Sequence, residues 1–493
     1  MLKLRQMAIA VALAFPVLAQ AQSNSELKSE IDQLKVEIRE LRALVKQQAQ
    51  TQAAVPPAGE SVAPEEFYQI RSKVEDQIDD KETAGFKGLR ISAGVDPTYV
   101  YNRAKGTGSF AFLNNNASIN GSGEVFSYDN STWGLAYIDL QKEMEGGTKL
   151  RMTLAPSKSA SSAFNYGNIV HEAYASIPLS DAQTRLMVGQ FADVSGYQPW
   201  LNTFGGANSI SKNQLYPGYG EFFVTKNVLF DFTNPYFYTG AGLDLVRGPW
   251  EAKLFLANFN SARNDVNLCP AATPGAGNVP CPGNVRNIHP TLIYNATYAK
   301  EEFWGFEFTG YEGLVANPAA GGNSRLDQFE IDGNYTRAEF SGNLQFTTGR
   351  QKNAAYNGED AQWWGVSVMA SQRVLPRLTL AARLDFLNNH KNGGGTFATA
   401  VAIPSTLDTA LGYVGDFYNG FGPGDPNAAG YDPNKGANHS ALSLSATYRY
   451  TPNVAFRGEV RFDHATTPSF YFYNDQSFRR SNQVIGLQTI VNY

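Results

Sequence analysis

The chain has 493 residues, of which 43% are hydrophobic, 17% are charged and 13% are aromatic, and its formal net charge is −5. The low charge content, together with 25 Tyr and 31 Phe, favours strands and interfaces. The acidic balance and the lack of a basic run argue against a nucleic-acid partner.

Residues 1–21 have the pattern of a cleavable secretory signal peptide. Lys3 and Arg5 precede an apolar stretch over residues 7–18, and a small-x-small cleavage site follows at 19–21. A membrane anchor is the alternative, but the apolar run is short for a bilayer span and no stop-transfer flank follows it. Beyond this segment the sequence has no apolar run of about 18 residues, so only a closed β-barrel would carry the chain across a bilayer.

Residues 22–50 are predicted to form a coiled coil that joins identical chains. Apolar residues alternate at spacings of four and three, which is a heptad seam of about three repeats. Glu30 at a g position faces Lys35 at the e position of a parallel neighbouring helix, so identical chains attract one another. The alternative is a single amphipathic helix lying on the barrel. The seam residues are Leu27, Ile31, Leu34, Ile38, Leu41 and Val45.

Residues 51–84 are predicted to be a linker. The first part contains Pro and Gly residues that cannot continue the helix. A short helical pattern follows, with Phe67, Ile70, Val74 and Ile78 on one face. From residue 85 onward the apolar residues recur with a period of two, so we expect a separate strand-rich domain over residues 85–493.

The strands of residues 85–493 are apolar on one face and charged on the other. In the hairpin over residues 329–346, whose turn is expected at 336–337, Phe329 and Ile331 share one face, and Glu330 and Asp332 share the other. Short turns alternate with long loops, which is typical of an outer-membrane barrel with both ends on the periplasmic side. The predicted fold is therefore an all-β membrane protein, an antiparallel transmembrane β-barrel of about sixteen strands preceded by a short α-helical coiled coil.

A soluble antiparallel sandwich or propeller is the alternative to a membrane barrel, because half-buried soluble strands alternate in the same way. Two features weigh against it. The faces opposite the apolar ones are too charged to form a second core. The apolar faces carry aromatic residues near the turns, as interfacial girdles require, and these are Trp250, Trp304, Tyr335, Trp364 and Tyr448.

The last nine residues, 485–493, alternate as a final strand that closes the barrel. Val491 is expected to face lipid, whereas Ile490 and Asn492 are expected to face the lumen. The ring of Tyr493 is expected to lie at the headgroup level of the periplasmic interface.

The two cysteines, Cys269 and Cys281, lie twelve residues apart in a long loop rich in Pro and Gly. In an exported protein this spacing predicts a disulfide that staples an external loop. Two Cys without further ligands, and five His without metal-ligand spacing, predict neither a metal site nor a cofactor. His439 and Ser440 are residue types that some outer-membrane lipases use, but catalysis needs such groups apart in the sequence and convergent in space.

Charged residues on the lumen faces are the candidates for solute selectivity. By alternation, basic residues point inward from strands at two places and acidic residues point inward between them, which would create a transverse field across a pore. The alternative is that many of them pair with one another and only solvate the lumen. Residues 195–223 have the length and aromatic content to fold inward as a constriction. The candidates are Lys149, Arg151, Glu330, Asp332, Glu339, Arg383, Arg449, Arg457 and Arg461.

The signal peptide, the coiled coil, the linker and the final strand together resemble a trimeric porin of the DcaP-like and phosphate-selective type. Residues 85–104 also resemble the first barrel strand of exported bacterial porin-like proteins. The resemblance implies passive uptake of small solutes, trimer formation, and insertion by the outer-membrane assembly machinery, which reads a terminal aromatic residue such as Tyr493. The Lys- and Arg-rich ladder of phosphate-selective porins is not evident here.

The resulting hypothesis is an outer-membrane porin, a water-filled channel for the passive diffusion of small hydrophilic solutes. Its coiled coil would lie in the periplasm, and its partners would be outer-membrane lipid and further copies of the same chain. It is not expected to be an enzyme. A structural or adhesive barrel with a closed lumen is the alternative, and a barrel lipase is the third possibility.

Overall fold

The computed structural model describes residues 87–112, 134–155, 169–198, 222–235, 237–259, 289–300, 303–317, 322–395 and 419–492. All of them belong to one compact unit, Phe86–Tyr493. The predicted signal peptide, coiled-coil seam and linker, both cysteines and Tyr493 lie outside the described residues. Among the described residues, no helix is both long enough and apolar enough to span a membrane.

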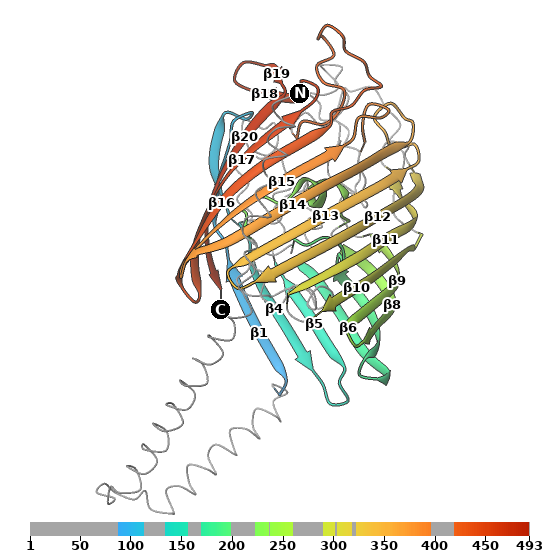
Figure 1. The fold of residues 1–493 in the computed structure, drawn as a ribbon. Coiled ribbons are helices and arrows are strands. Elements are labelled where there is room, and N and C mark those ends of the chain that lie inside the picture. Colours follow the sequence, from blue (N-terminus) through green and yellow to red (C-terminus); the bar gives the residue numbers. More distant parts are fainter. Residues whose placement is uncertain are drawn as a thin grey trace, which may run out of the picture. The chain divides into compact units, whose positions relative to one another are not determined.

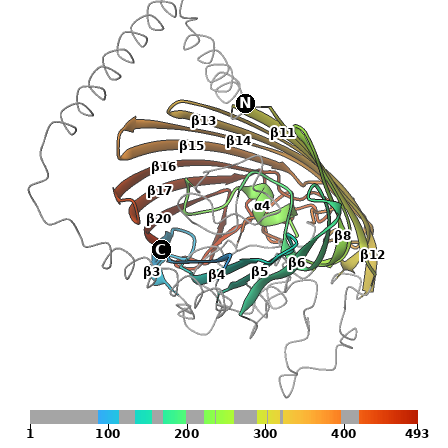
Figure 2. The ribbon, with the colours of Figure 1, turned by 90° about the horizontal axis from the view of Figure 1, so that it is seen from below.

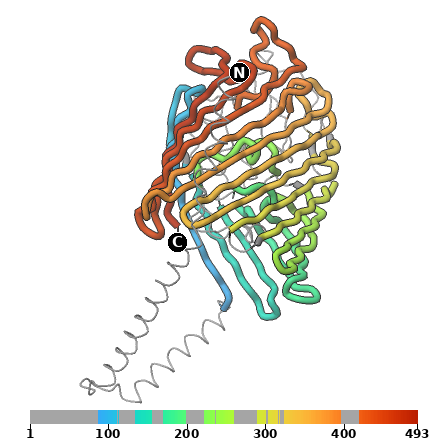
Figure 3. Tube along the Cα trace, viewed as in Figure 1, coloured from blue at the N-terminus to red at the C-terminus, as the bar shows by residue number. Residues whose placement is uncertain are grey.

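Antiparallel strands form a closed β-barrel, which Figures 1 and 3 show from the side. From β4 to β17 each strand pairs with the next strand of the barrel sheet in the chain, β4 also pairs with β1, and the last strand, β20, pairs with β17, β1 and β2. The strands of the barrel sheet are β1 (Leu89–Val95), β2 (Thr98–Asn102), β3 (Thr107–Ala111), β4 (Ala136–Glu143), β5 (Lys149–Leu154), β6 (Val170–Asp181), β7 (Thr184–Ala192), β8 (Phe237–Arg247), β9 (Trp250–Phe259), β10 (Thr291–Lys300), β11 (Trp304–Asn317), β12 (Gly322–Arg337), β13 (Phe340–Gln351), β14 (Ala361–Leu375), β15 (Leu378–Asn388), β16 (His439–Thr451), β17 (Val454–Ala465) and β20 (Ser481–Asn492). A separate hairpin, β18 (Phe470–Phe472) and β19 (Ser477–Arg479), and one short helix, α4 (Val228–Thr233), complete the described elements.

The barrel wall has sixteen strand positions, although the sheet contains 18 strands. β1 and β2 are two halves of one wall strand, because both pair with β20 in the same register. β3 pairs with β2 while β4 pairs with β1, so β3 and β4 share the next position. The predicted antiparallel barrel of about sixteen strands is therefore confirmed.

The wall strand that closes the barrel is interrupted at Asp96 and Pro97. Proline has no backbone N–H to donate to a sheet ladder, so a strand tolerates it only at a break or an edge. The pairing with β20 continues across the break, since Val95 lies opposite Val491 and Thr98 lies opposite Gln488. The N–H of Thr489 donates to the carbonyl of Pro97 at 3.1 Å, which bridges the two halves.

Burial alternates along the strands as the period-two pattern predicts. On β12, Glu330 and Asp332 are buried in the barrel interior, whereas Ile331 between them is 51% exposed on the outside. On β20, Val491 is exposed and faces outward while Ile490 faces the interior, both as expected, and Ile490 is fully buried there. The interior next to the end of β20 is therefore packed around Ile490.

Short turns join the strands at one rim of the barrel, where they occupy residues 182–183, 248–249, 338–339, 376–377 and 452–453. Both ends of the barrel chain lie at this rim, because Glu143 donates to Gly88 at 3.0 Å and Asn492 donates to Asn453 at 2.9 Å through their backbones. One predicted turn is displaced, since it lies at 338–339 and not at 336–337. Ala338 adopts a left-handed φ of 49° there, which suits a tight two-residue turn.

Aromatic side chains cover much of the outer surface, as predicted. Trp250 contacts Tyr298 and Phe306 with ring centroids 4.7 and 5.9 Å apart, and the ring of Trp364 lies 5.3 Å from that of Phe386. The five predicted girdle residues are all exposed on the outside, and they are Trp250, Trp304, Tyr335, Trp364 and Tyr448. A band of exposed aromatic rings at the edge of an apolar surface is typical of outer-membrane barrels.

Candidate functional site in the barrel lumen

The described parts of the connection between β7 and β8 lie inside the barrel (Figure 2). Two parts of it are described, residues 193–198 and residues 222–235, and from residue 223 to residue 235 every one is buried. Figure 2, which views the barrel along its length, shows α4 of the second part inside the ring of strands. We call residues 222–235 the inward segment. The prediction that residues 195–223 fold inward agrees with the described ends of that stretch, and the helix that follows was not predicted.

Local sequence explains the short helix of the inward segment. Asn227 is its N-cap, and the side-chain Oδ1 accepts a hydrogen bond from the N–H of Phe230 at 2.6 Å. Thr233 in the last turn donates from Oγ1 to the carbonyl of Leu229 at 2.7 Å. The amide of Asn227 also donates to Gln345 Oε1 on β13 at 2.9 Å, so the cap ties the helix to the wall.

Two wall glycines make room for the inward segment. A Cβ atom added at Gly365 on β14 would lie 2.3 Å from Cδ2 of Leu229, and one added at Gly486 on β20 would lie 2.9 Å from Val224. Contacts this short do not occur between real side chains, so a larger residue at either position would force Leu229 or Val224 to shift. Gly486 belongs to the final strand, in which the alternation placed it on the lumen face.

Glu459 on β17 holds the start of the inward segment. The backbone N–H groups of Val224 and Thr225 both donate to Oε2 at 2.7 Å, and the hydroxyl of Thr225 donates to Oε1 at 2.6 Å. Glu459 is 2% exposed, and the guanidinium of Arg383 lies 3.8 Å from its Oε1. Hydrogen bonds to a buried carboxylate are stronger than neutral ones, so Glu459 is the strongest described anchor of the segment.

Two arginines hold the carbonyls of the same turn. Arg383 on β15 donates to the carbonyl oxygens of Thr225 and Lys226, both at 2.9 Å, and Arg461 on β17 donates to that of Lys226 at 2.8 Å. Each guanidinium is also paired along its own strand, Arg383 with Asp385 at 3.1 Å and Arg461 with Asp463 at 2.9 Å. Both side chains are fully buried. Their positive charges are therefore balanced by carboxylates, and their N–H groups are used in hydrogen bonds to the inward segment.

A third arginine and an aromatic ring extend this contact. Arg457 donates to the carbonyl of Phe223 at 3.2 Å and to Gln488 Oε1 on β20 at 2.9 Å. The ring of Phe223 lies 4.4 Å from the guanidinium carbon of Arg383, which is a cation–π distance. The hydroxyl of Ser445 on β16 donates to the carbonyl of Phe222. Strands β15–β17 and β20 thus form one face of the wall that binds residues 222–226.

The first part of the connection meets a different portion of the wall. Asp193 accepts hydrogen bonds from the hydroxyls of Tyr238 on β8 and Tyr311 on β11, the second at 2.7 Å. The N–H of Gly196 donates to Asp332 on β12 at 3.2 Å, and the hydroxyls of Tyr197 and Ser367 lie 2.8 Å apart. Residues 193–198 are therefore fixed by β8, β11, β12 and β14.

The phenol of Tyr197 lies inside the barrel and outside the strands. Burial raises its pKa above the usual range, and the carboxylate of Asp385 raises it further. Tyr197 is therefore a neutral hydrogen-bonding group at any physiological pH. It belongs to the same network as Arg383, because Ser367 donates to Asp385 at 2.7 Å.

The nine predicted pore-lining residues fall into two groups. Six of them are buried in the interior: Arg151, Glu330, Asp332, Arg383, Arg457 and Arg461. Arg151 pairs with Asp139 on β4 at 2.8 Å and lies 3.7 Å from Glu172 on β6, away from the inward segment. The structure brings Arg383, Arg457 and Arg461 together on the face of β15 and β17 that binds the inward segment.

The other three predicted residues lie near the short-turn rim. Glu339 occupies the displaced turn and pairs with Arg373 at 3.0 Å, with both side chains about half exposed to solvent. Arg449 is exposed, next to a register shift between β16 and β17 at Arg449 and Thr451. Lys149 is only partly buried at the start of β5. None of the three lines the described part of the lumen where the segment is held.

Glu459 and Asp463 are the acidic residues that the sequence offers as pairing partners for Arg457 and Arg461, and Arg461 does pair with Asp463 at 2.9 Å. Asp385, which pairs with Arg383 at 3.1 Å, is the acidic partner that the sequence did not single out. The inward orientation of all three follows from the same alternation, and Glu459 lies between two predicted arginines in the sequence. Glu459 contacts Val224 and Thr225, and Asp385 accepts a hydrogen bond from the N–H of Val228 at 3.3 Å. These partners are more than 150 positions apart in the chain, and no local pattern signals the contacts. Among the described residues there is no cluster of His, Cys, Asp and Glu side chains suited to a metal ion.

The two residues considered for a lipase do not converge. His439 faces the interior, where Nε2 lies 3.2 Å from Asp463 Oδ1, whereas the adjacent Ser440 donates to the backbone of His464 at 3.3 Å. Neighbouring residues of a strand point to opposite faces, so these side chains cannot form a nucleophile–base pair. His464 Nδ1 lies 3.1 Å from Ser481 Oγ on the exposed side, and no described carboxylate orients that imidazole.

The closed barrel, its apolar outer surface with aromatic girdles and its polar interior define an outer-membrane β-barrel of the porin-like class. The chain belongs to the family described as "Protein of unknown function (DUF3138)", which it matches over residues 64–493. No curated protein sequence matches the chain.

Solved structures with a similar fold include three outer-membrane proteins. The anion-selective porin from Comamonas acidovorans is 11% identical with a TM-score of 0.45, and the match covers 82% of this chain and 99% of the porin. The outer-membrane channel DcaP of Acinetobacter baumannii is 11% identical with a TM-score of 0.44, covering 82% of this chain and 97% of DcaP. OmpT of Vibrio cholerae is 9% identical with a TM-score of 0.45, covering 82% of this chain and 97% of OmpT. The assignment to the class rests on the geometry of the barrel itself.

Proposed function

We propose that the protein is an outer-membrane channel for the passive diffusion of small hydrophilic solutes, narrowed by the inward segment. The observation that carries the proposal is the polarity of the interior. Charged and amide side chains face inward all around the barrel, for example Arg151, Asp244, Glu307, Gln328 and Gln488. Because such groups cost free energy unless they meet water or hydrogen-bond partners, a lumen lined with them suits an aqueous path.

We further propose that several copies, most simply three, associate through the heptad seam of residues 22–50. This part of the proposal is supported by the sequence pattern alone. A periplasmic coiled coil would hold identical barrels side by side without taking part in solute passage.

The arginines of the lumen have a specific part in this function. Arg383, Arg457 and Arg461 donate to carbonyls of Phe223, Thr225 and Lys226. Their main role in the proposed channel is therefore to fix the position of the constriction. Acidic residues dominate another region of the wall, where Glu307 on β11 lies directly opposite Asp332 on β12. A solute that passes between the two regions would experience a transverse field.

A barrel with a closed lumen is the second candidate function. It is favoured by the complete burial of residues 223–235 and by the number of hydrogen bonds that hold them to the wall. A structural or adhesive barrel would need its plug to stay in place permanently. The two candidates therefore differ in whether ions cross the folded protein.

Single-channel recording of the purified full-length protein in planar lipid bilayers tests the proposal. We expect discrete conductance steps, with reversal potentials in a salt gradient that report the charge preference. Heat-unfolded protein is the matched control for detergent artefacts. The variant Glu459→Gln, which removes the charge that binds the backbone of Val224 and Thr225, should loosen the inward segment. If neither the natural protein nor this variant conducts, the barrel is closed and the channel proposal is wrong.

A further inference from the structure

Acidic side chains outnumber basic ones on one side of the barrel interior. Among the side chains that the structure describes on β8–β13, one buried side chain is basic, Lys253, and its Nζ lies 2.5 Å from Glu251 Oε1. This part of the wall therefore carries more negative than positive charge. We call it the acidic sector, and its buried acidic residues are Asp244, Glu251, Glu307, Glu330 and Asp332.

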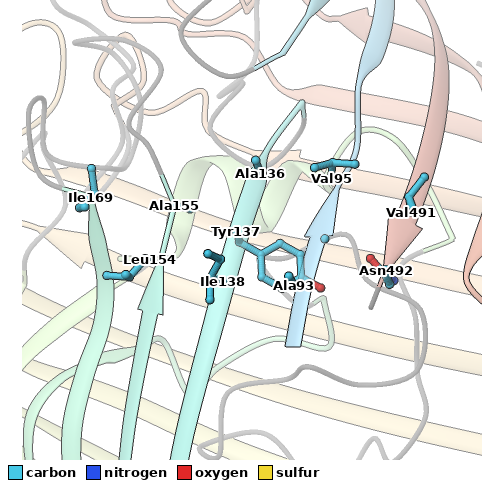
Figure 4. Close-up of a pocket in the computed structure, with 11 residues that line it drawn as sticks. Ala93, Val95, Ala136, Tyr137, Ile138, Leu154, Ala155, Ile169, Val491 and Asn492 are labelled. Carbon is cyan, nitrogen blue, oxygen red and sulfur yellow. The ribbon is translucent and has the colours of Figure 1, made fainter. Parts of the chain in front are cut away.

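Other parts of the described wall do not have this excess of negative charge. Three buried arginines and three buried carboxylates lie together on β15 and β17, and they are Arg383, Arg457, Arg461, Asp385, Glu459 and Asp463. Figure 4 shows a hollow of about 630 Å³ beside β1, β4 and β20, and the described residues that line it, such as Val95 and Ile138, are uncharged. The acidic sector is therefore the part of the described wall with the strongest attraction for a charged solute.

Three carboxylates of the acidic sector lie close together on β11 and β12. Glu307 is directly opposite Asp332, and Glu330 is two residues before Asp332 on the same face of β12. The hydroxyls of Thr297 and Thr309 donate to Glu307 at 3.3 and 3.2 Å, and the N–H of Gly196 donates to Asp332 at 3.2 Å. Like charges directly opposite one another in a sheet are destabilising, so a cation near this pair would be bound favourably.

Two buried amide side chains border these carboxylates. Asn343 on β13 is 4% exposed, and neither its Oδ1 nor its Nδ2 has a hydrogen-bond partner among the residues that the structure describes. The same holds for Nε2 of Gln345, which is 1% exposed and lies opposite Asp332 in the sheet.

The amide of Gln345 points into a small space beside Gly196. A Cβ atom built on Gly196 would lie 3.3 Å from Gln345 Nε2 and 3.4 Å from Glu330 Oε1, so the absence of a side chain there leaves both groups facing one point. Buried polar groups without partners cost free energy, which a ligand with matching groups would recover. The amides and the carboxylates therefore indicate a ligand that is both cationic and rich in hydrogen-bonding groups.

We propose that the acidic sector, together with Asn343 and Gln345, binds small cationic solutes that carry a protonated amine beside hydroxyl groups, such as an amino sugar. Carboxylates accept charge-assisted hydrogen bonds from an ammonium group. The amides of Asn343 and Gln345 donate to hydroxyl oxygens, and Asn343 Oδ1 accepts from a hydroxyl. The inference rests on the proposed channel and names the class of solute that it prefers.

A pair of matched double variants tests this inference. Glu307→Gln with Asp332→Asn removes two charges from the acidic sector. Glu312→Gln with Asp327→Asn is the control, because these residues also lie opposite one another on β11 and β12 but point to the outside, where both are partly exposed. Heat-modifiable gel mobility shows that each variant is folded.

Two measurements are made on the purified full-length protein. In planar bilayers with a potassium chloride gradient, we expect a preference for potassium over chloride of about threefold, which falls by about twofold in the inward variant and not in the control. In titration calorimetry in weakly acidic buffer, we expect glucosamine to bind about tenfold more tightly than glucose, which differs at one carbon by a hydroxyl in place of the ammonium group. The inward variant should lose this difference.

The outcomes separate the site from the channel. A conducting barrel without preference for potassium, or equal binding of glucosamine and glucose by the natural protein, would overturn the inference and leave the channel standing. If neither the natural protein nor Glu459→Gln conducts, the channel is rejected and calorimetry alone decides. Glucosamine binding that the inward variant loses and the control keeps would then support the site, and the absence of binding would overturn it.

Discussion

Replacing Glu459 by Gln should loosen the inward segment while leaving the barrel wall intact. The substitution keeps the size of the side chain and removes the charge that accepts three hydrogen bonds from Val224 and Thr225, at 2.7, 2.7 and 2.6 Å. Hydrogen bonds to charged groups contribute about 1.5–3 kcal/mol each, and neutral ones about 0.5–1.5 kcal/mol. A loss of about 1 kcal/mol per bond weakens the anchor by about 3 kcal/mol, or roughly 100-fold in the closed-to-loose equilibrium.

Hydrogen exchange followed by mass spectrometry measures this effect directly. Peptides that cover residues 222–235 should exchange much faster in Glu459→Gln than in the natural protein, whereas peptides from β12 to β14 should not change. The matched control is Glu339→Gln, because Glu339 pairs with Arg373 at 3.0 Å in a half-exposed turn. An exposed pair contributes about 0–1 kcal/mol, so the control should leave the inward segment protected. Equal protection in both variants would refute the assignment of Glu459 as the anchor.

Three other predictions follow from the wall, the lumen and the N-terminal segment. Val491→Asp places a charge on the lipid-facing surface near the rim and should destabilise the barrel by about 1 kcal/mol in urea titrations, whereas Asn492→Asp should change it less. Replacing Arg457 and Arg461 together by Ser removes two positive charges, leaves Asp463 without its partner and frees carbonyls of the inward segment, so it should shift reversal potentials toward cations and raise conductance. Unchanged potentials would mean that these groups do not border the path of the ions. Deleting residues 23–48 should lower the heat resistance of the oligomer on gels without abolishing the barrel, and a truncated oligomer of equal stability would show that the seam has another role.

The wall of the barrel could be predicted from the sequence because each strand carries its own signal. A period of two fixes which residues face lipid and which face the interior, and the tight turns fix where the strands reverse. The exposed Ile331 and the buried Glu330 and Asp332 are where the alternation put them. The position of one turn was predicted wrongly, because Glu339 lies in a turn that begins two residues later than expected. Arg449 lies opposite the buried Ala455, as the alternation predicts, but it is exposed at the rim beside a register shift.

The interior could not be predicted in the same way. Alternation indicates that Arg461 faces inward, but it does not indicate what the guanidinium meets there, and its partner Lys226 is 235 residues away in the chain. Ile490 shows the same limit, because alternation predicts its inward position but does not predict that other groups bury it completely there. Which part of a lumen contains water depends on how a long connection folds back, and that depends on contacts between distant residues.

Liposome swelling with uncharged solutes of graded size tests the central claim most directly, because it reports passage through the folded barrel without any effect of charge. If the inward segment narrows an aqueous channel, liposomes that contain the natural protein will swell in small sugars with a sharp size limit, and Glu459→Gln will move that limit to larger solutes. If liposomes with the natural protein and liposomes with the variant both fail to swell in the smallest solute, the lumen is closed and the account of this barrel as a channel is contradicted.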